Sequence, residues 1–269
     1  MKEGKGYLLA TGEAAATRLR LLDQIFGPAT RELLTKAGLT EGWRVAEIGC
    51  GSGLVALWMA ERVGPRGSIA AVDQSGAQLE VARRNAQGVG LKNISFHEGS
   101  ANETGLPRDS FDMVYSRFLL CHVKNPLAAL KEMRALLRNG GVLVSEDYDY
   151  TSIASEPPTR AYARLVEIIG NMDAKRGVDS TIGSKLQRLF REAGFATVEV
   201  SVKQASLQRG EGKRFWELTL REATPAIVEA GVASAEELES ICAELQAIAR
   251  EEKTVVSVAR VFQVWSRKD

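Results

Sequence analysis

Nine residues near the start of the chain decide its fold: Val45-Ala-Glu-Ile-Gly-Cys-Gly-Ser-Gly53. A short apolar run ends in Glu47, three glycines follow at every second position, and an amphipathic run comes directly after them. This order predicts a buried strand, a tight turn, and a helix whose unsatisfied N–H groups face the turn. Because Gly49, Gly51 and Gly53 have no β-carbon, a ligand can lie against this backbone. We therefore expect a nucleoside-type ligand here.

The spacing of the glycines separates two classes of nucleotide-binding protein. A dinucleotide fingerprint needs a glycine at position 54, which is Leu54 in this chain, so a nicotinamide dehydrogenase is disfavoured. Glu47 would also repel a pyrophosphate, whereas it suits a cationic or hydroxyl-bearing ligand. The next strand, expected over 68–72, ends at Asp73, about twenty residues after the glycine turn, where a βαβ unit places a carboxylate against ribose hydroxyls.

Four ordered features make the chain resemble the class I S-adenosylmethionine-dependent methyltransferases. The glycine turn fits their first motif, E/D-x-G-x-G-x-G, and Asp73 follows at the expected distance. Leu106-Pro107, followed by Ser110-Phe-Asp112 before an apolar strand, resembles their second motif. Leu137-Arg-Asn-Gly-Gly141 resembles the third, L-x-P-G-G, with asparagine in place of proline. The resemblance implies that S-adenosyl-L-methionine is the cofactor.

Strands and helices alternate from Trp43 onward, which is typical of a parallel sheet covered by helices on both faces. We expect an α/β fold with a Rossmann-like seven-stranded sheet, mostly parallel with an antiparallel last strand. Residues 1–40 are predicted to form a helical N-terminal arm or lid, with its helix broken at Gly27-Pro28. Residues 41–269 are predicted to form the methyltransferase domain, with a helical insertion at about 205–254.

The resemblance also implies particular cofactor contacts. Similar members of the family begin with a Tyr-Leu segment and an arginine-bearing helix, which implies that Tyr7 and Arg18 close over the methionine half of the cofactor, arginine being suited to its carboxylate. A solvated helical arm is the simpler alternative. Gln74 would flank the adenosine. The family carries Gly-Asp-Ala after the third strand, and here Ser100 replaces the aspartate that accepts a hydrogen bond from adenine. Serine is a weaker acceptor, and the backbone of Ala101 is the alternative contact.

The fourth strand, expected over 111–116, brings further side chains to the edge of the sheet where open α/β folds bind ligands. Arg117 is counted among the cofactor contacts. His122 is the candidate general base, because imidazole is nearly neutral at physiological pH and can accept a proton there; a packing role is the alternative. Glu146, Asp147 and Tyr148, at the end of the fifth strand, are alternative bases or substrate contacts.

The amino-acid composition limits the kinds of binding partner and the cellular location that we expect. A net charge of +1 over 269 residues gives no general attraction for nucleic acid or anionic membrane, and no apolar stretch is long enough for a membrane span. Cys50, counted with the cofactor contacts, is expected to be a buried filler rather than a reactive thiol; with Cys121 and Cys242 it forms no CxxC pair, which indicates a reducing cytoplasm. We expect no metal, because the acidic residues after the fifth strand are nearly contiguous. The apolar stripe of the helix expected over 235–252 is predicted to be a packing face, with a homodimer or lid contact as alternatives.

The sequence therefore predicts an enzyme that transfers a methyl group from S-adenosylmethionine to an O, N or C atom of a small-molecule acceptor. A catalytically inactive, regulatory module that binds the cofactor is one alternative, because Ser100 and Asn139 depart from the family pattern. An RNA or DNA methyltransferase is another, although amino-methylating members carry Asn/Asp-Pro-Pro-aromatic where this chain has Ser116-Arg-Phe-Leu119.

Overall fold

The computed structural model describes residue 9 and residues 12–269. Its central sheet has seven strands in the order β3-β2-β1-β4-β5-β10-β7. The first five strands in this order are parallel, whereas β10 runs antiparallel to both of its neighbours. The predicted sheet with an antiparallel last strand is confirmed. The strands are β1 (Arg44–Ile48), β2 (Ser68–Asp73), β3 (Ile94–Glu98), β4 (Phe111–Arg117), β5 (Leu137–Asp149), β7 (Glu199–Lys203) and β10 (Arg260–Arg267).

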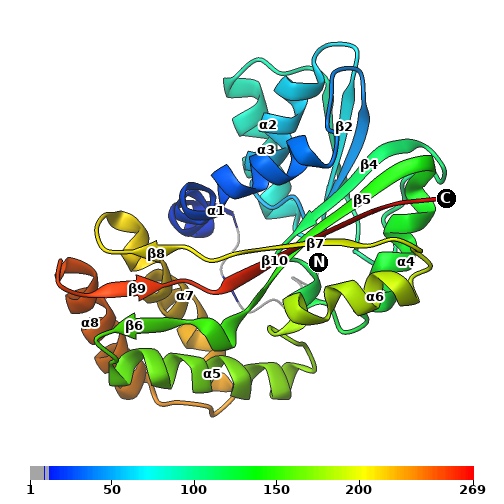
Figure 1. Cartoon of the computed structure of the whole chain (residues 1–269). Coiled ribbons are helices and arrows are strands. Elements are labelled where there is room, and N and C mark those ends of the chain that lie inside the picture. The colour runs from blue at the N-terminus through cyan, green and yellow to red at the C-terminus, as the bar shows by residue number, and fades with distance from the viewer. Residues whose placement is uncertain (1–8, 10–11) are drawn as a thin grey trace.

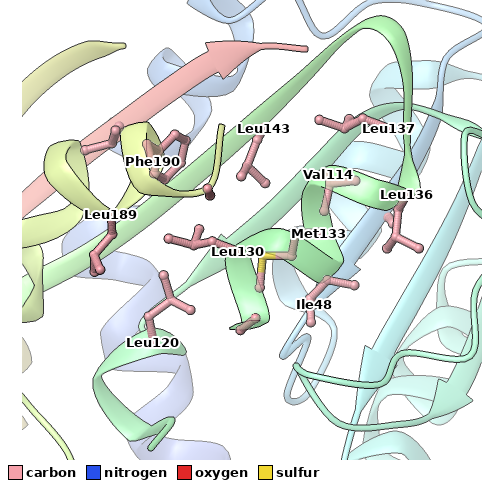
Figure 2. Close-up of a cluster of buried hydrophobic side chains, with 14 of the residues drawn as sticks. Ile48, Val114, Leu120, Leu130, Met133, Leu136, Leu137, Leu143, Leu189 and Phe190 are labelled. Carbon is pink, nitrogen blue, oxygen red and sulfur yellow. The ribbon is translucent and has the colours of Figure 1, made fainter. Parts of the chain in front are cut away.

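Helices cover both faces of this sheet, because successive strand residues point to opposite sides. One face packs against α4 (Pro126–Leu136) and α6 (Leu186–Glu192), and Figure 2 shows Leu130, Met133 and Phe190 meeting the strands there. The other face packs against α2 (Leu54–Val63), α3 (Gly76–Gly88) and the second half of α1 (Ala16–Lys36). The described residues also form short 3₁₀ turns: η1 (Gly12–Ala15), η2 (Leu120–His122), η3 (Tyr150–Ser152), η4 (Ile182–Lys185) and η5 (Glu211–Arg214).

The first long helix continues through the predicted break. α1 runs from Ala16 to Lys36 with Pro28 inside it, so the prediction of two helices was wrong. Asp23 and Arg31 form an ion pair of 3.4 Å that spans one turn on either side of Gly27. A β-carbon at Gly27 would come within 2.9 Å of both side chains. The missing side chain therefore leaves room for a pair that holds the helix together across the proline.

A second group of elements lies beside the sheet and has a hydrophobic core of its own. Helices α5 (Arg160–Arg176), α7 (Phe215–Glu229) and α8 (Ala235–Arg250) pack together with a small sheet of order β6-β9-β8, as the lower left of Figure 1 shows. Its strands are β6 (Ala154–Glu156), β8 (Ser206–Leu207) and β9 (Val255–Ser257). The alternating run at the end of the chain is divided between two strands, β9 in this small sheet and β10 in the main sheet.

The apolar stripe of α8 is a packing face, as predicted. Leu238, Ile241, Leu245 and Ile248 are all buried in the second core. The helix begins at a serine cap, where the Oγ of Ser234 accepts a hydrogen bond of 3.1 Å from the backbone N–H three residues later. No helix among the described residues has both the length and the apolar character needed to cross a membrane.

Candidate active site

A cleft of about 1460 Å³ opens at the carboxyl ends of the parallel strands, where open α/β sheets bind ligands. Its walls come from the glycine turn, from the ends of β2, β3 and β4, and from α1, α5 and α7. Most of the residues predicted from sequence line it: Arg18, Glu47, Gly49, Cys50, Gly51, Asp73, Gln74, Ser100, Ala101, Arg117 and His122. Gly53 does not line it, and Tyr7 lies outside the described residues.

The three glycines of the turn have different roles, although all have positive φ. A β-carbon at Gly49 would meet Leu119 at 2.9 Å, and one at Gly53 would meet Ala82 at 3.0 Å, so these two glycines let the turn pack against its surroundings. Only Gly51 faces open space. The room for a ligand against the backbone is therefore at Gly51, and the contact expected at Gly53 stays a prediction.

Asp73 ties the glycine turn to the start of α3. Its carboxylate accepts hydrogen bonds of 2.8 Å from the N–H of Gly51 and 2.9 Å from that of Ser75. Burial raises the pKa of this group, and the hydrogen bonds oppose the rise. Each carboxylate oxygen has a second lone pair, so the predicted contact with ribose hydroxyls is compatible with these bonds.

Glu47 is a buried group of the cleft whose hydrogen bonding is incomplete. Its side chain is 3% exposed, and its Oε2 is buried without a hydrogen-bond partner. Burial raises its pKa to about 8; the positive charge of Arg117 opposes this, and the negative charges of Asp73 and Asp23 add to it. A buried carboxyl group with an unpartnered oxygen is a natural partner for a cation or a hydrogen-bond donor.

Arg117 is held by α1. It donates hydrogen bonds of 3.2 Å to the Oγ1 of Thr30 and 3.3 Å to Asp23. Thr30 in turn donates a bond of 2.8 Å to Glu146, which also accepts one of 2.7 Å from the hydroxyl of Tyr115. Glu146 is therefore committed beneath α1, and the structure does not bring it to the cleft as an alternative base.

Arg18 is buried, with 4% of its side chain exposed, so the alternative of a solvated arm is wrong at this residue. Its Nε donates a hydrogen bond of 2.7 Å to Glu222 on α7. Its Nη2 is buried without a hydrogen-bond partner. One side of the guanidinium fork thus links α1 to α7, while the other retains a donor for an anion such as a carboxylate.

His122 ends η2 at the meeting point of the cleft and an apolar chamber. Burial, with the charges of Arg176 and Arg18, lowers its pKa to about 3, so the imidazole is neutral at pH 7 but weakly basic. Tyr148 lines the same junction. Asp147 does not line either space; it accepts hydrogen bonds from the backbone N–H groups of residues 121 and 148.

The chamber beyond His122 lies between α5 and α7 and is a small recess of about 60 Å³ beside the main cleft. Its walls are mostly apolar, and Trp216 and Thr219 of α7 are shared with the main cleft. Gln78, Thr219 and Glu222 were not predicted from the sequence as parts of the site. A recurrence of small and apolar residues at helical spacing in α7 was the available signal, but it indicates any packed helix face equally well. The chamber walls include Leu165, Ile168, Met172, Leu220, Ala223 and Ile227.

Cys50 is a buried filler, as expected: burial raises the pKa of its thiol, as does the charge of Glu47. Within the part of the chain that the structure describes, no three His, Cys, Asp or Glu side chains are grouped so that they could hold a metal ion.

The donor and acceptor set of the cleft fits S-adenosylmethionine. This cofactor has cationic groups suited to the unpartnered oxygen of Glu47, ribose hydroxyls suited to Asp73, and a carboxylate suited to the unpartnered nitrogen of Arg18. The open space at Gly51 allows a ligand to approach the backbone.

Comparisons with known proteins agree with this fit. Residues 39–194, more than half of the chain, match a family described as "Methyltransferase domain", and the chain belongs to that family. It is 33% identical over 132 residues to the aklanonic acid methyltransferase DauC of Streptomyces sp. (strain C5), an alignment that covers 49% of this chain and 60% of that protein. It is 31% identical over 180 residues to a demethylmenaquinone methyltransferase of Listeria welshimeri, covering 62% of this chain and 76% of the relative.

The fold is similar to that of the YcgJ protein of Bacillus subtilis, with a TM-score of 0.58 and 21% identity over 87% of this chain and 95% of that one. The class I S-adenosylmethionine-dependent methyltransferase inferred from the motifs is thereby confirmed as an enzyme class and as a fold.

Proposed function

We propose that the chain transfers the methyl group of S-adenosylmethionine to an O, N or C atom of a small, largely apolar acceptor. One observation carries this proposal: a single cleft has the glycine turn with two carboxyl groups at one end and adjoins an apolar chamber at the other. Its volume of about 1460 Å³ exceeds the roughly 300–1,000 Å³ of most single-ligand pockets. Two relatives are named for methyl transfer to small molecules, aklanonic acid and demethylmenaquinone.

The residues of the cofactor end have distinct tasks in this proposal. Glu47 faces the positively charged groups, Asp73 accepts the ribose hydroxyls, and Arg18 binds the carboxylate. Gln74, Ser100 and Ala101 border the adenosine. The cofactor supplies an activated methyl group on a sulfonium centre, while the chain supplies alignment and exclusion of water.

His122 lies where the acceptor would meet the cofactor. With a pKa of about 3 it is neutral at physiological pH, so it can accept a hydrogen bond from the nucleophile. An imidazole this weakly basic is poorly matched to removing a proton from an unactivated alcohol. We infer that His122 orients an acceptor whose nucleophile is an acidic hydroxyl, an acidic carbon or an amine.

In this proposal, different segments of the chain have different roles. Residues 1–40 would act as the arm over the cofactor, and residues 41–269 as the catalytic domain, whose insertion at 205–254 supplies α7, one of the two helices that line the acceptor chamber. A cytoplasmic location is supported by three buried cysteines that form no disulfide. The homodimer stays a prediction. The α8 stripe that suggested it packs inside the chain and therefore does not support it.

Calorimetry with S-adenosylhomocysteine tests the cofactor site. Asp73→Ala and Gly51→Val should each weaken binding by at least tenfold. Gly105→Val is the matched control, because Gly105 also has positive φ and open space around it but does not line the cleft. Unchanged affinity in both cleft variants would refute the site.

Methyl release measured against a panel of small acceptors then separates an enzyme from an inactive binding module. A salt-sensitive gel shift with RNA or DNA would favour a nucleic-acid substrate instead.

A further inference from the structure

Gln78 is a buried polar residue of the cleft that has no evident structural role. It lies on the first turn of α3, lines the cleft, and is 5% exposed. Its side-chain Oε1 is buried and has no hydrogen-bond partner. Burying an amide oxygen without a partner is unfavourable, so native proteins rarely retain one without a reason.

The position of Gln78 along the cleft can be deduced from its neighbours. Asp73 ends β2, Ser75 caps α3, and the backbone N–H of Gln78 donates a bond of 3.3 Å to the hydroxyl of Ser75. The start of α3 also approaches the end of β3, because a side chain at Gly76 would come within 3.6 Å of Glu98. Gln78 therefore lines the cleft near the ends of β2 and β3.

This is the part of the cleft where a base is expected. In a βαβ unit the glycine turn and the carboxylate at the end of the second strand hold the groups up to the ribose, so a base attached to that ribose extends past Asp73 towards the outer strand β3. Adenine presents an exocyclic amine, and a site that recognises it must supply a hydrogen-bond acceptor.

Ser100, the acceptor expected from the family resemblance, is exposed to solvent and already accepts one hydrogen bond within its own turn. One lone pair of its hydroxyl stays available, but the residue is not a buried acceptor without a partner. Its Oγ accepts a hydrogen bond of 3.1 Å from the N–H of Glu103, and the backbones of the two residues pair with each other. Among the described polar side chains of the cleft walls in this region, Gln78 is the one with an unpartnered buried acceptor.

We propose that Oε1 of Gln78 accepts the hydrogen bond from the exocyclic amine of adenine, the role that the family resemblance gives to the residue at Ser100. The inference rests on the proposed function, because it needs the cofactor in this cleft. It adds a residue that determines specificity for adenine over other purines.

The test compares two ligands by calorimetry: S-adenosylhomocysteine and its purine analogue that lacks the exocyclic amine. The unmodified chain should prefer the amine-bearing ligand by about three- to tenfold, as one hydrogen bond of this kind provides. Gln78→Met should bind both ligands equally, Gln78→Glu should retain the preference because it keeps an acceptor oxygen, and Ser100→Ala should leave the preference unchanged.

The Tm of the ligand-free chain is a second measurement. If Gln78 had a structural role, replacing it would lower the Tm. Gln78→Met removes an unpartnered buried oxygen, so its Tm should equal or exceed that of the unmodified chain. Gln87→Met, at an exposed position of the same helix, should change neither the preference nor the Tm. A preference that persists in Gln78→Met, or that disappears in Ser100→Ala, would overturn the assignment. If the unmodified chain binds neither ligand, the proposed function fails and this inference fails with it.

Discussion

Glu47 should release a proton when the cofactor binds. Its pKa in the ligand-free chain is about 8 because it is buried, so at pH 7 about 0.9 of the molecules carry a proton on this carboxyl group. A sulfonium or ammonium group next to Glu47 favours the ionised form and lowers the pKa. Binding of S-adenosylmethionine at pH 7 should then release up to about 0.9 proton per ligand.

Calorimetry in buffers of different ionisation enthalpy, such as phosphate and Tris, measures this release directly. The observed binding enthalpy should vary linearly with the buffer's enthalpy, and the slope gives the number of protons. Glu47→Gln, which keeps the size and one acceptor oxygen, should give a slope near zero. S-adenosylhomocysteine, which has the ammonium but no sulfonium, separates the contributions of the two charges. A slope near zero in the unmodified chain, or an equal slope in Glu47→Gln, would refute the placement of the cation beside Glu47.

The same pKa predicts how the stability of the ligand-free chain depends on pH. The folded-state pKa of Glu47 is raised above its unfolded value near 4.5, so its contribution is fully present below pH 4.5 and is lost as pH rises through 8. The full loss is on the order of 5 kcal/mol for a shift of this size. Urea denaturation at pH 6 and pH 8.5 should show Glu47→Gln to be more stable than the unmodified chain at the higher pH.

Two further predictions concern the turn and the junction with the acceptor chamber. Gly53→Ala should lower the free energy of unfolding by about 1–3 kcal/mol, because the residue has positive φ and its new methyl group meets Ala82. Gly51→Ala also places a side chain at positive φ but meets no neighbour. Urea denaturation should therefore show a smaller loss of stability for Gly51→Ala than for Gly53→Ala. For whichever acceptor a methyl-release screen identifies, the profile of kcat/KM against pH should show no limb near pH 6.5 due to His122, whose pKa is about 3. A limb near 6.5 that disappears in His122→Gln would contradict this.

The features that the sequence could predict depend on residues close together in the chain. The glycine turn, Asp73 and the alternation of strands and helices are encoded over a few tens of residues by backbone freedom and by hydrophobic periodicity. The strand order then follows the usual rules for connecting parallel strands. The predicted sheet and the positions of most cofactor residues at its edge therefore agree with the structure.

The features that could not be predicted depend on contacts between distant residues. Arg18 pairs with Glu222, 204 positions away, and Thr30 with Glu146, 116 positions away. No local pattern reports such pairs. The pKa of His122 has the same origin: its type suggested a base, but burial beside two arginines makes it a weak one.

The two ligands of the proposed reaction bind to different parts of the fold, and α1 connects these two parts. The cofactor end belongs to the main sheet, whereas the acceptor chamber belongs to the second core formed by α5, α7 and α8. Two separate hydrophobic clusters, with Tyr148 packed against both, would permit the acceptor site to vary while the cofactor site stays fixed. α1 is bonded to the sheet through Thr30 and Glu146 and to α7 through Arg18 and Glu222. A ligand carboxylate at Arg18 would therefore contact the same side chain that holds α7, a wall of the chamber. Binding of the cofactor would then affect the acceptor site.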